Sequence, residues 1–156
     1  MSHVTLAQGV PIVLSVGSWD QLEELTVALQ LMINSNDVLR TAVQWKGLPQ
    51  AFQIVFRRAD LPAEEVRLHR DEDHMRQLRD WLRPARQSMD VSIAPLIRVR
   101  AAAHTSRKEW YVWMQFHRMV IGQKLVAQIL QRVDKHFDGS KMMRPRIIFG
   151  EDVLSH

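Results

Sequence analysis

Two consecutive strand-like runs, residues 95–103 and 110–116, constrain the fold of this chain more than any other feature. The second run, WYVWMQF, is apolar on both faces, which predicts a strand at the centre of a sheet. In the first run apolar residues alternate with Arg98 and Arg100, which predicts a strand with one face in water. Residues 104–108 supply the turn between them, so the chain must build a sheet around this pair.

Three amphipathic segments predict helices on that sheet. The first begins at residues Ser18-Trp19-Asp20-Gln21, a sequence typical of a capping box in which Ser18 is the N-cap and Gln21 reaches back. The second covers residues 71–87, where Pro84 must kink or stop the helix. The third covers residues 123–137, with apolar side chains every three or four positions.

The remaining strands are shorter. Residues 10–16 predict a strand that is an edge or begins at Pro11, and residues 39–45 and 52–57 predict a hairpin. A polar run, residues 65–69, predicts one more strand. The order is β-α-β-β-β-α-β-β-α, an α+β fold of helices on a sheet.

The chain has the length of one domain, because 156 residues is close to the common domain size. We therefore assign residues 1–140 to a single domain and residues 141–156 to an irregular C-terminal tail. The sequence has no cysteine, no apolar run long enough to span a bilayer and no secretory signal at its start, which favours a soluble, cytoplasmic protein without a membrane partner. A net charge of +4 favours acidic partners.

Several kinds of site find no support in the sequence. The histidines lack the HExxH spacing of a metal site, no GxSxG motif marks a serine nucleophile, and the six glycines form no phosphate-binding loop. We expect no metal and no bound cofactor.

Three segments carry a resemblance to a known family. Residues 38–42 (VLRTA), residues 47–55 (GLPQAFQIV) and residues 89–98 (MDVSIAPLIR) occur in the order and at the spacing of motifs in nonribosomal peptide synthetase condensation domains. The chain resembles the N-terminal lobe of such a domain.

The resemblance implies a chloramphenicol acetyltransferase-like lobe, with a mixed β-sheet covered by helices. In this family two such lobes form a tunnel that carrier proteins enter, and the substrates are held on the phosphopantetheine of those carriers. The resemblance ends where the second lobe begins, so we expect a truncated domain. The surface that a second lobe covers would then be an exposed apolar patch near Arg40, His117 and Arg118, open to self-association as a homodimer or to a partner.

The family's HHxxxDG motif is degenerate here. Residues 117–123 read HRMVIGQ, so His117 matches the first histidine and Arg118 replaces the functional second one. Gly122 stands at the aspartate position if the alignment has no gap, or at the motif glycine if one residue is deleted, and the aspartate is missing in both cases. A guanidinium stays protonated and accepts no hydrogen bond, so it cannot replace an imidazole base. The resemblance also implies that Arg40 once paired with that aspartate. We expect Arg40 to be exposed or to pair again, with Asp37, and His117 to be a structural residue beside the core that holds its strand end through a backbone hydrogen bond.

These observations favour a non-catalytic lobe that acts as an interaction or structural module in a nonribosomal peptide synthetase or hybrid polyketide assembly line. It would contact carrier or neighbouring domains. A strip of basic residues on the second helix is the candidate docking site: Arg76, Arg79, Arg83 and Arg86. Two alternatives stay open. The chain could be one half of a split condensation enzyme that forms amide bonds, or a basic nucleic-acid-binding module that uses the same arginines.

Overall fold

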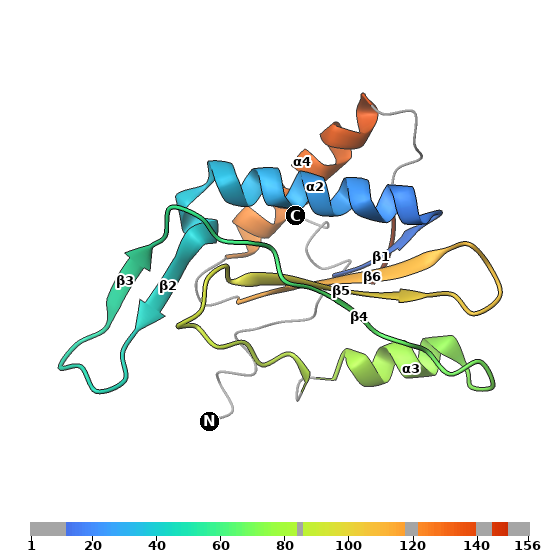
Figure 1. Cartoon of the computed structure of the whole chain (residues 1–156), viewed down its shortest axis with the longest axis horizontal. Helices are drawn as coiled ribbons and strands as arrows, with labels where there is room; N and C mark the ends of the chain where they lie inside the picture. The colour runs from blue at the N-terminus through green and yellow to red at the C-terminus, as the bar shows by residue number, and fades with distance from the viewer. Residues whose placement is uncertain (1–11, 84–85, 118–121, 140–144, 150–156) are drawn as a thin grey trace.

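The computed structural model describes residues 12–83, 86–117, 122–139 and 145–149, and everything below concerns these residues. They form an α+β domain whose elements follow one another along the chain as shown in Figure 1. The elements are β1 (Ile12–Val16), α2 (Trp19–Ser35), the 3-10 helix η1 (Asp37–Arg40), β2 (Thr41–Gln44), β3 (Phe52–Val55), β4 (Ala63–Glu65), α3 (His74–Trp81), β5 (Ile97–Ala103), β6 (Trp110–Phe116), α4 (Gln123–Asp138) and β7 (Arg146–Phe149).

A mixed five-stranded sheet forms the centre of the domain, in the order β4-β5-β6-β1-β7. Its neighbouring strands are antiparallel except for β4 and β5, which are parallel. Strand β6 occupies the middle position, as its apolar sequence predicts. Strands β2 and β3 pair only with each other and form a separate two-stranded sheet.

Helices cover both faces of the five-stranded sheet, with α2 and α4 on one side and α3 on the other (Figure 1). The larger core cluster joins α2 and α4 to alternate residues of the strands, including Leu14 and Met114. The smaller cluster joins Leu78 of α3 to the opposite face, where Val13 and Trp113 lie. Successive residues of β1 and β6 thus serve different cores, which is the two-residue period of a strand.

The start of α2 differs in one detail from a capping box. Ser18 is the N-cap, and its hydroxyl accepts a hydrogen bond from the Gln21 amide nitrogen at 3.1 Å. The Gln21 side chain reaches back as predicted, but its Oε1 accepts from the Gly17 main-chain nitrogen. The glutamine therefore stabilises the turn one residue before the N-cap.

Helix α3 is much shorter than the predicted residues 71–87. It begins after its N-cap Asp73, whose Oδ1 accepts from the Met75 amide nitrogen at 3.1 Å, and it ends at Trp81. The helix stops before Pro84, as the missing amide of a proline requires. Leu78 is the only residue within α3 that is fully buried.

Three strand assignments also need correction. β1 lies between β6 and β7, so the edge alternative is wrong, whereas the alternative that the strand begins at Pro11 agrees with its first residue, Ile12. β4 covers residues 63–65 instead of residues 65–69. Residues 141–156 were expected to be irregular, but Arg146–Phe149 form β7, which pairs with β1.

The sequence predicted that the face of β5 that carries Arg98 and Arg100 is open to water, and this prediction is wrong. Both arginines are only partly exposed, because the chain after α3 crosses over them. Arg98 donates to the Ser88 carbonyl at 3.1 Å, and both arginines donate to the Arg86 carbonyl at 3.2 Å. A polar layer therefore replaces solvent on this part of the sheet. No helix in the described ranges has the length and apolar character needed to cross a membrane.

Two leucines of α2 test this arrangement. Leu29 faces the larger core and is 1% exposed, whereas Leu31 is 53% exposed. We expect Leu29→Ala to lower the free energy of unfolding by about 2–5 kcal/mol, because it leaves a cavity between α2 and the sheet. The control Leu31→Ala should change it by about 0.5 kcal/mol or less. Urea denaturation followed by circular dichroism measures both, and equal losses would contradict the orientation of α2.

Candidate functional site

His117 lies directly after β6, at the position where the resemblance places the first motif histidine. Its main-chain nitrogen donates to the Leu96 carbonyl at 3.0 Å, and the residue is 4% exposed. This hydrogen bond holds the end of β6, but it comes from the main chain and not from the imidazole ring. The ring differs from a well-satisfied core histidine, because its buried Nδ1 has no hydrogen-bond partner among the described residues. Burial lowers the pKa of His117, so the ring is neutral at physiological pH.

The next motif positions divide between two parts of the chain. Arg118 lies outside the described residues. Gly122 is the N-cap of α4, and no side chain caps this helix at that position. The Gly122 carbonyl accepts the hydrogen bond from the Val126 nitrogen at 3.1 Å that opens the helix. Gly122 therefore places no carboxylate at the start of α4, where the family motif has an aspartate if the alignment has no gap.

Arg40 lies at the end of η1 and is 9% exposed. Its Nη1 donates to the carbonyls of Ile33 and Asn34 at 2.7 and 2.8 Å, and its Nε donates to the Phe56 carbonyl at 2.9 Å. Its Nη2 forms an ion pair with the Asp37 carboxylate at 2.5 Å. The predicted pairing with Asp37 is therefore confirmed, and the alternative of an exposed Arg40 is wrong.

The carbonyls that bind Arg40 explain why it is buried. Ile33 and Asn34 belong to the last turn of α2, whose carbonyls have no partner within the helix. Phe56 follows β3, and its main-chain nitrogen in turn donates to the Arg40 carbonyl at 2.9 Å. One side chain therefore ties the end of α2 to the base of the β2–β3 hairpin.

The four arginines of the candidate docking strip fall into two pairs. Arg76 and Arg79 lie on α3, are exposed, and form no ion pair with another described residue. Arg83 and Arg86 follow the helix, and both bind Asp80, at 2.8 and 3.1 Å. Arg86 also stacks on Trp81, with its guanidinium carbon 4.3 Å from the ring centroid. Of the four arginines, Arg76 and Arg79 are the two without an ion pair to a described carboxylate.

A surface hollow of about 610 Å³ lies beside this strip. Arg76 and Arg86 line it, together with Asp80 and Trp81. One wall is therefore basic and aromatic, while Asp80 neutralises part of that charge.

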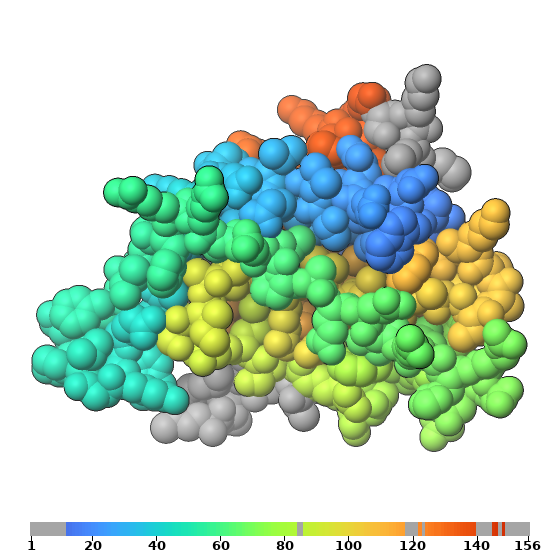
Figure 2. Space-filling model, viewed as in Figure 1, coloured from blue at the N-terminus to red at the C-terminus, as the bar shows by residue number. Residues whose placement is uncertain are grey.

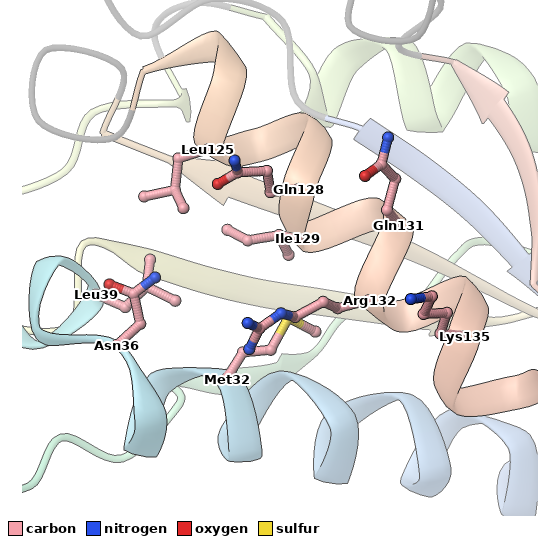
Figure 3. Close-up of a pocket in the computed structure, with 9 residues that line it drawn as sticks. All are labelled: Met32, Asn36, Leu39, Leu125, Gln128, Ile129, Gln131, Arg132 and Lys135. Atoms are coloured by element: carbon pink, nitrogen blue, oxygen red, sulfur yellow. The ribbon is translucent and has the colours of Figure 1, made fainter.

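A second depression, between α2 and α4, was not predicted from the sequence. It has a volume of about 320 Å³, and the side chains of Met32, Ile129 and Arg132 lie in the space between the two helices (Figure 3). Its floor is apolar and its rim carries Arg132 and Lys135. The lining residues are Met32, Asn36, Leu39, Leu125, Gln128, Ile129, Gln131, Arg132 and Lys135. Periodicity indicated the apolar face of each helix, but not that these two faces meet.

Among the described residues no three histidine or carboxylate side chains are grouped to hold a metal ion. The His117 ring is buried, and burial lowers its pKa.

The sequence of the chain is similar to segments of two much longer proteins. No protein family profile matches the chain. Malpinin synthetase of Mortierella alpina is 28% identical over 148 residues, which is 92% of this chain, and malpibaldin synthetase of the same organism is 26% identical over 121 residues. This chain spans about 2% of the length of either synthetase.

Solved structures show the same fold. A four-domain nonribosomal peptide synthetase bound to AMP and glycine matches 84% of this chain with a TM-score of 0.69 and 14% identity, over 10% of its own length. The starter condensation domain of rhizomide synthetase matches 86% of this chain with a TM-score of 0.64 and 15% identity, over 35% of its length. The resemblance to a condensation-domain lobe is therefore confirmed in fold.

The Arg40 network can be tested by removing its two ends separately. Arg40→Met removes every donor and leaves three carbonyls without their partner, so we expect a loss of about 1–3 kcal/mol in the free energy of unfolding. Asp37→Asn removes only the ion pair, and the Asp37 side chain is 79% exposed, so its loss should be about 1 kcal/mol or less. Chemical denaturation of both variants measures the difference. An Asp37→Asn loss as large as that of Arg40→Met would show that the ion pair, not the carbonyl bonds, stabilises this corner.

His117 should make stability depend on pH. Because burial lowers the pKa of His117 in the folded chain, the unfolded chain binds the proton more tightly. The stability from the neutral ring is present above about pH 6.5, the ordinary histidine pKa, and is lost as the pH falls through and below that value. We expect a His117→Gln variant to show a shallower loss of unfolding free energy between about pH 7 and pH 5. An NMR titration that gives His117 an ordinary or raised pKa would contradict this.

Proposed function

We propose that this chain is a non-catalytic condensation-type lobe that acts as an interaction module in a nonribosomal peptide synthetase or hybrid polyketide assembly line. Its partners would be carrier domains or neighbouring domains of the assembly line. The observation that carries the proposal is the network of Arg40. Four of the five guanidinium donors are engaged by residues 33–56, so within the described residues this arginine braces the end of α2 and the hairpin.

The motif residues support the same proposal. Arg118 stands where the resemblance requires a base, and a guanidinium has no lone pair to accept a proton at neutral pH. Gly122 contributes no carboxylate at the N-terminus of α4. His117 is buried. A single substitution at position 118 would therefore restore the second histidine of a motif that still lacks its aspartate.

The docking surface is assigned to Arg76 and Arg79, the two members of the basic strip that no described carboxylate neutralises. Both are exposed on α3, on the side of the sheet opposite α2 and α4. Carrier domains with an acidic surface would be attracted by such a pair and by the net charge of +4. Arg83 and Arg86 would shape the neighbouring hollow through Asp80 and Trp81.

Binding to a phosphopantetheinylated carrier domain tests the proposal. We expect the chain to bind this probe, and the double variant Arg76→Ala/Arg79→Ala to bind on the order of tenfold more weakly, because it loses two exposed charge contacts. Isothermal titration calorimetry measures both affinities. The matched control is Arg57→Ala/Arg58→Ala, which removes the same charge from another exposed position and should bind like the unaltered chain.

A condensation assay with aminoacylated donor and acceptor carrier domains completes the test. Neither the chain nor its Arg118→His variant should yield a peptide by mass spectrometry. Peptide formation would favour the split-enzyme alternative, and absence of carrier binding would remove the interaction module. Retention on DNA that falls steeply with salt and depends on Arg76 and Arg79 would favour the nucleic-acid alternative.

A further inference from the structure

The β2–β3 hairpin stands apart from the rest of the domain. It forms its own two-stranded sheet and extends from one end of the molecule (Figures 1 and 2). All four residues of its outer strand β3 are exposed, although three of them are apolar. The exposed fractions of Phe52, Ile54 and Val55 are 47%, 40% and 52%, and Phe56 directly after the strand is 40% exposed.

The outer edge of β3 has free main-chain groups. Phe56 donates its main-chain hydrogen bond to Arg40, and Ile54 pairs with Ala42, so these alternate residues direct their main-chain groups toward β2. Gln53 and Val55 have the opposite parity and direct theirs outward. No described segment pairs with this edge. A short apolar strand with an open edge is a template for another strand.

Residues 52–56 read Phe-Gln-Ile-Val-Phe, so the first, third and fifth positions are the same when the segment is reversed. If two β3 strands pair antiparallel with Ile54 opposite Ile54, then Phe52 lies opposite Phe56 and Gln53 opposite Val55. The pair Gln53–Val55 is then the hydrogen-bonded one, which is the parity that the outward main-chain groups require. Apolar side chains meet apolar side chains on one face.

We infer that β3 is a self-association edge, which pairs with β3 of a second copy of this chain about a two-fold axis at Ile54. Such an interface is isologous, so the same residues serve both copies. It joins two marginal two-stranded hairpins into one four-stranded sheet, and sheets of three or more strands are the stable ones.

Charge favours a second copy as the occupant. Residues 52–56 carry no charge, so two chains of net charge +4 meet at this edge without like charges opposite each other. In this register Arg57 and Arg58 lie opposite Ala51 and Gln50, which are also uncharged. The strand itself contains no proline and no lysine, the residues that commonly protect an edge from such pairing. This inference is independent of the carrier-docking proposal, since the arginines of α3 take no part in it.

Disulfide trapping tests the register, because the chain has no cysteine of its own. In Ile54→Cys the two cysteines face each other in a non-hydrogen-bonded pair, about 4.5 Å apart between Cα atoms, which a disulfide spans. We expect most of this variant to become a covalent dimer on mild oxidation, as seen by non-reducing electrophoresis. In the matched control Val55→Cys the two cysteines are offset by two residues, beyond the reach of about 7 Å, so this variant should not form a covalent dimer.

A second variant tests the edge without a cysteine. Val55→Pro removes a main-chain N–H that points away from β2, so the hairpin can persist while the outer edge is blocked. Sedimentation velocity should show the unaltered chain shifting from monomer toward dimer with concentration, and Val55→Pro remaining monomeric. Equal cross-linking of Ile54→Cys and Val55→Cys, or a chain that stays monomeric at high concentration, would overturn the inference.

Discussion

Trp113 and Met114 are neighbours in β6 and point to opposite faces of the sheet, yet both are completely buried. Since neither face can be left to water, the chain has to place helices on both sides of one sheet. Met114 is enclosed by the long helices α2 and α4. On the other side α3 is short and contributes one buried leucine, so arginine and glutamine side chains that bind the Arg86 carbonyl complete the cover. The polar layer over β5 thus follows from the shortness of α3.

Arg40 connects this domain to the hairpin that stands outside it. Its guanidinium satisfies carbonyls at the end of α2 and after β3, and its own main chain continues the β2–β3 ladder to Phe56. A second anchor is the bond from the Val43 nitrogen to the Val91 carbonyl, at 2.8 Å. The inner strand of the hairpin is held firmly on both sides while the outer strand is open. An edge that is fixed in place loses less conformational freedom when another strand pairs with it.

The sequence predicted most reliably what is local. The run WYVWMQF has the same bounds as β6, and the predicted helix 123–137 differs from α4 by one residue. The pairing of Arg40 with Asp37 was also within reach, because the two residues are three positions apart. Helix α3 was predicted too long because apolar spacing continues past Trp81, although Pro84 stops the helix. β7 was missed because a four-residue strand is justified only by its pairing with β1, more than 130 residues away along the chain. The groove between α2 and α4 was missed for the same reason, since the sequence shows the apolar face of each helix but not which faces meet.

The two proposed binding surfaces, the α3 arginines and the edge of β3, differ in the kind of interaction they offer. Arg76 and Arg79 act through charge, which attracts at long range and weakens as salt screens it. The edge of β3 carries no charge between residues 52 and 56, so main-chain hydrogen bonds and apolar contacts act there only at short range. The two surfaces also lie on different elements, one on the α3 face of the sheet and the other on the separate hairpin. Occupying one therefore leaves the other open, so a pair of chains joined through β3 would still present the arginines of both α3 helices.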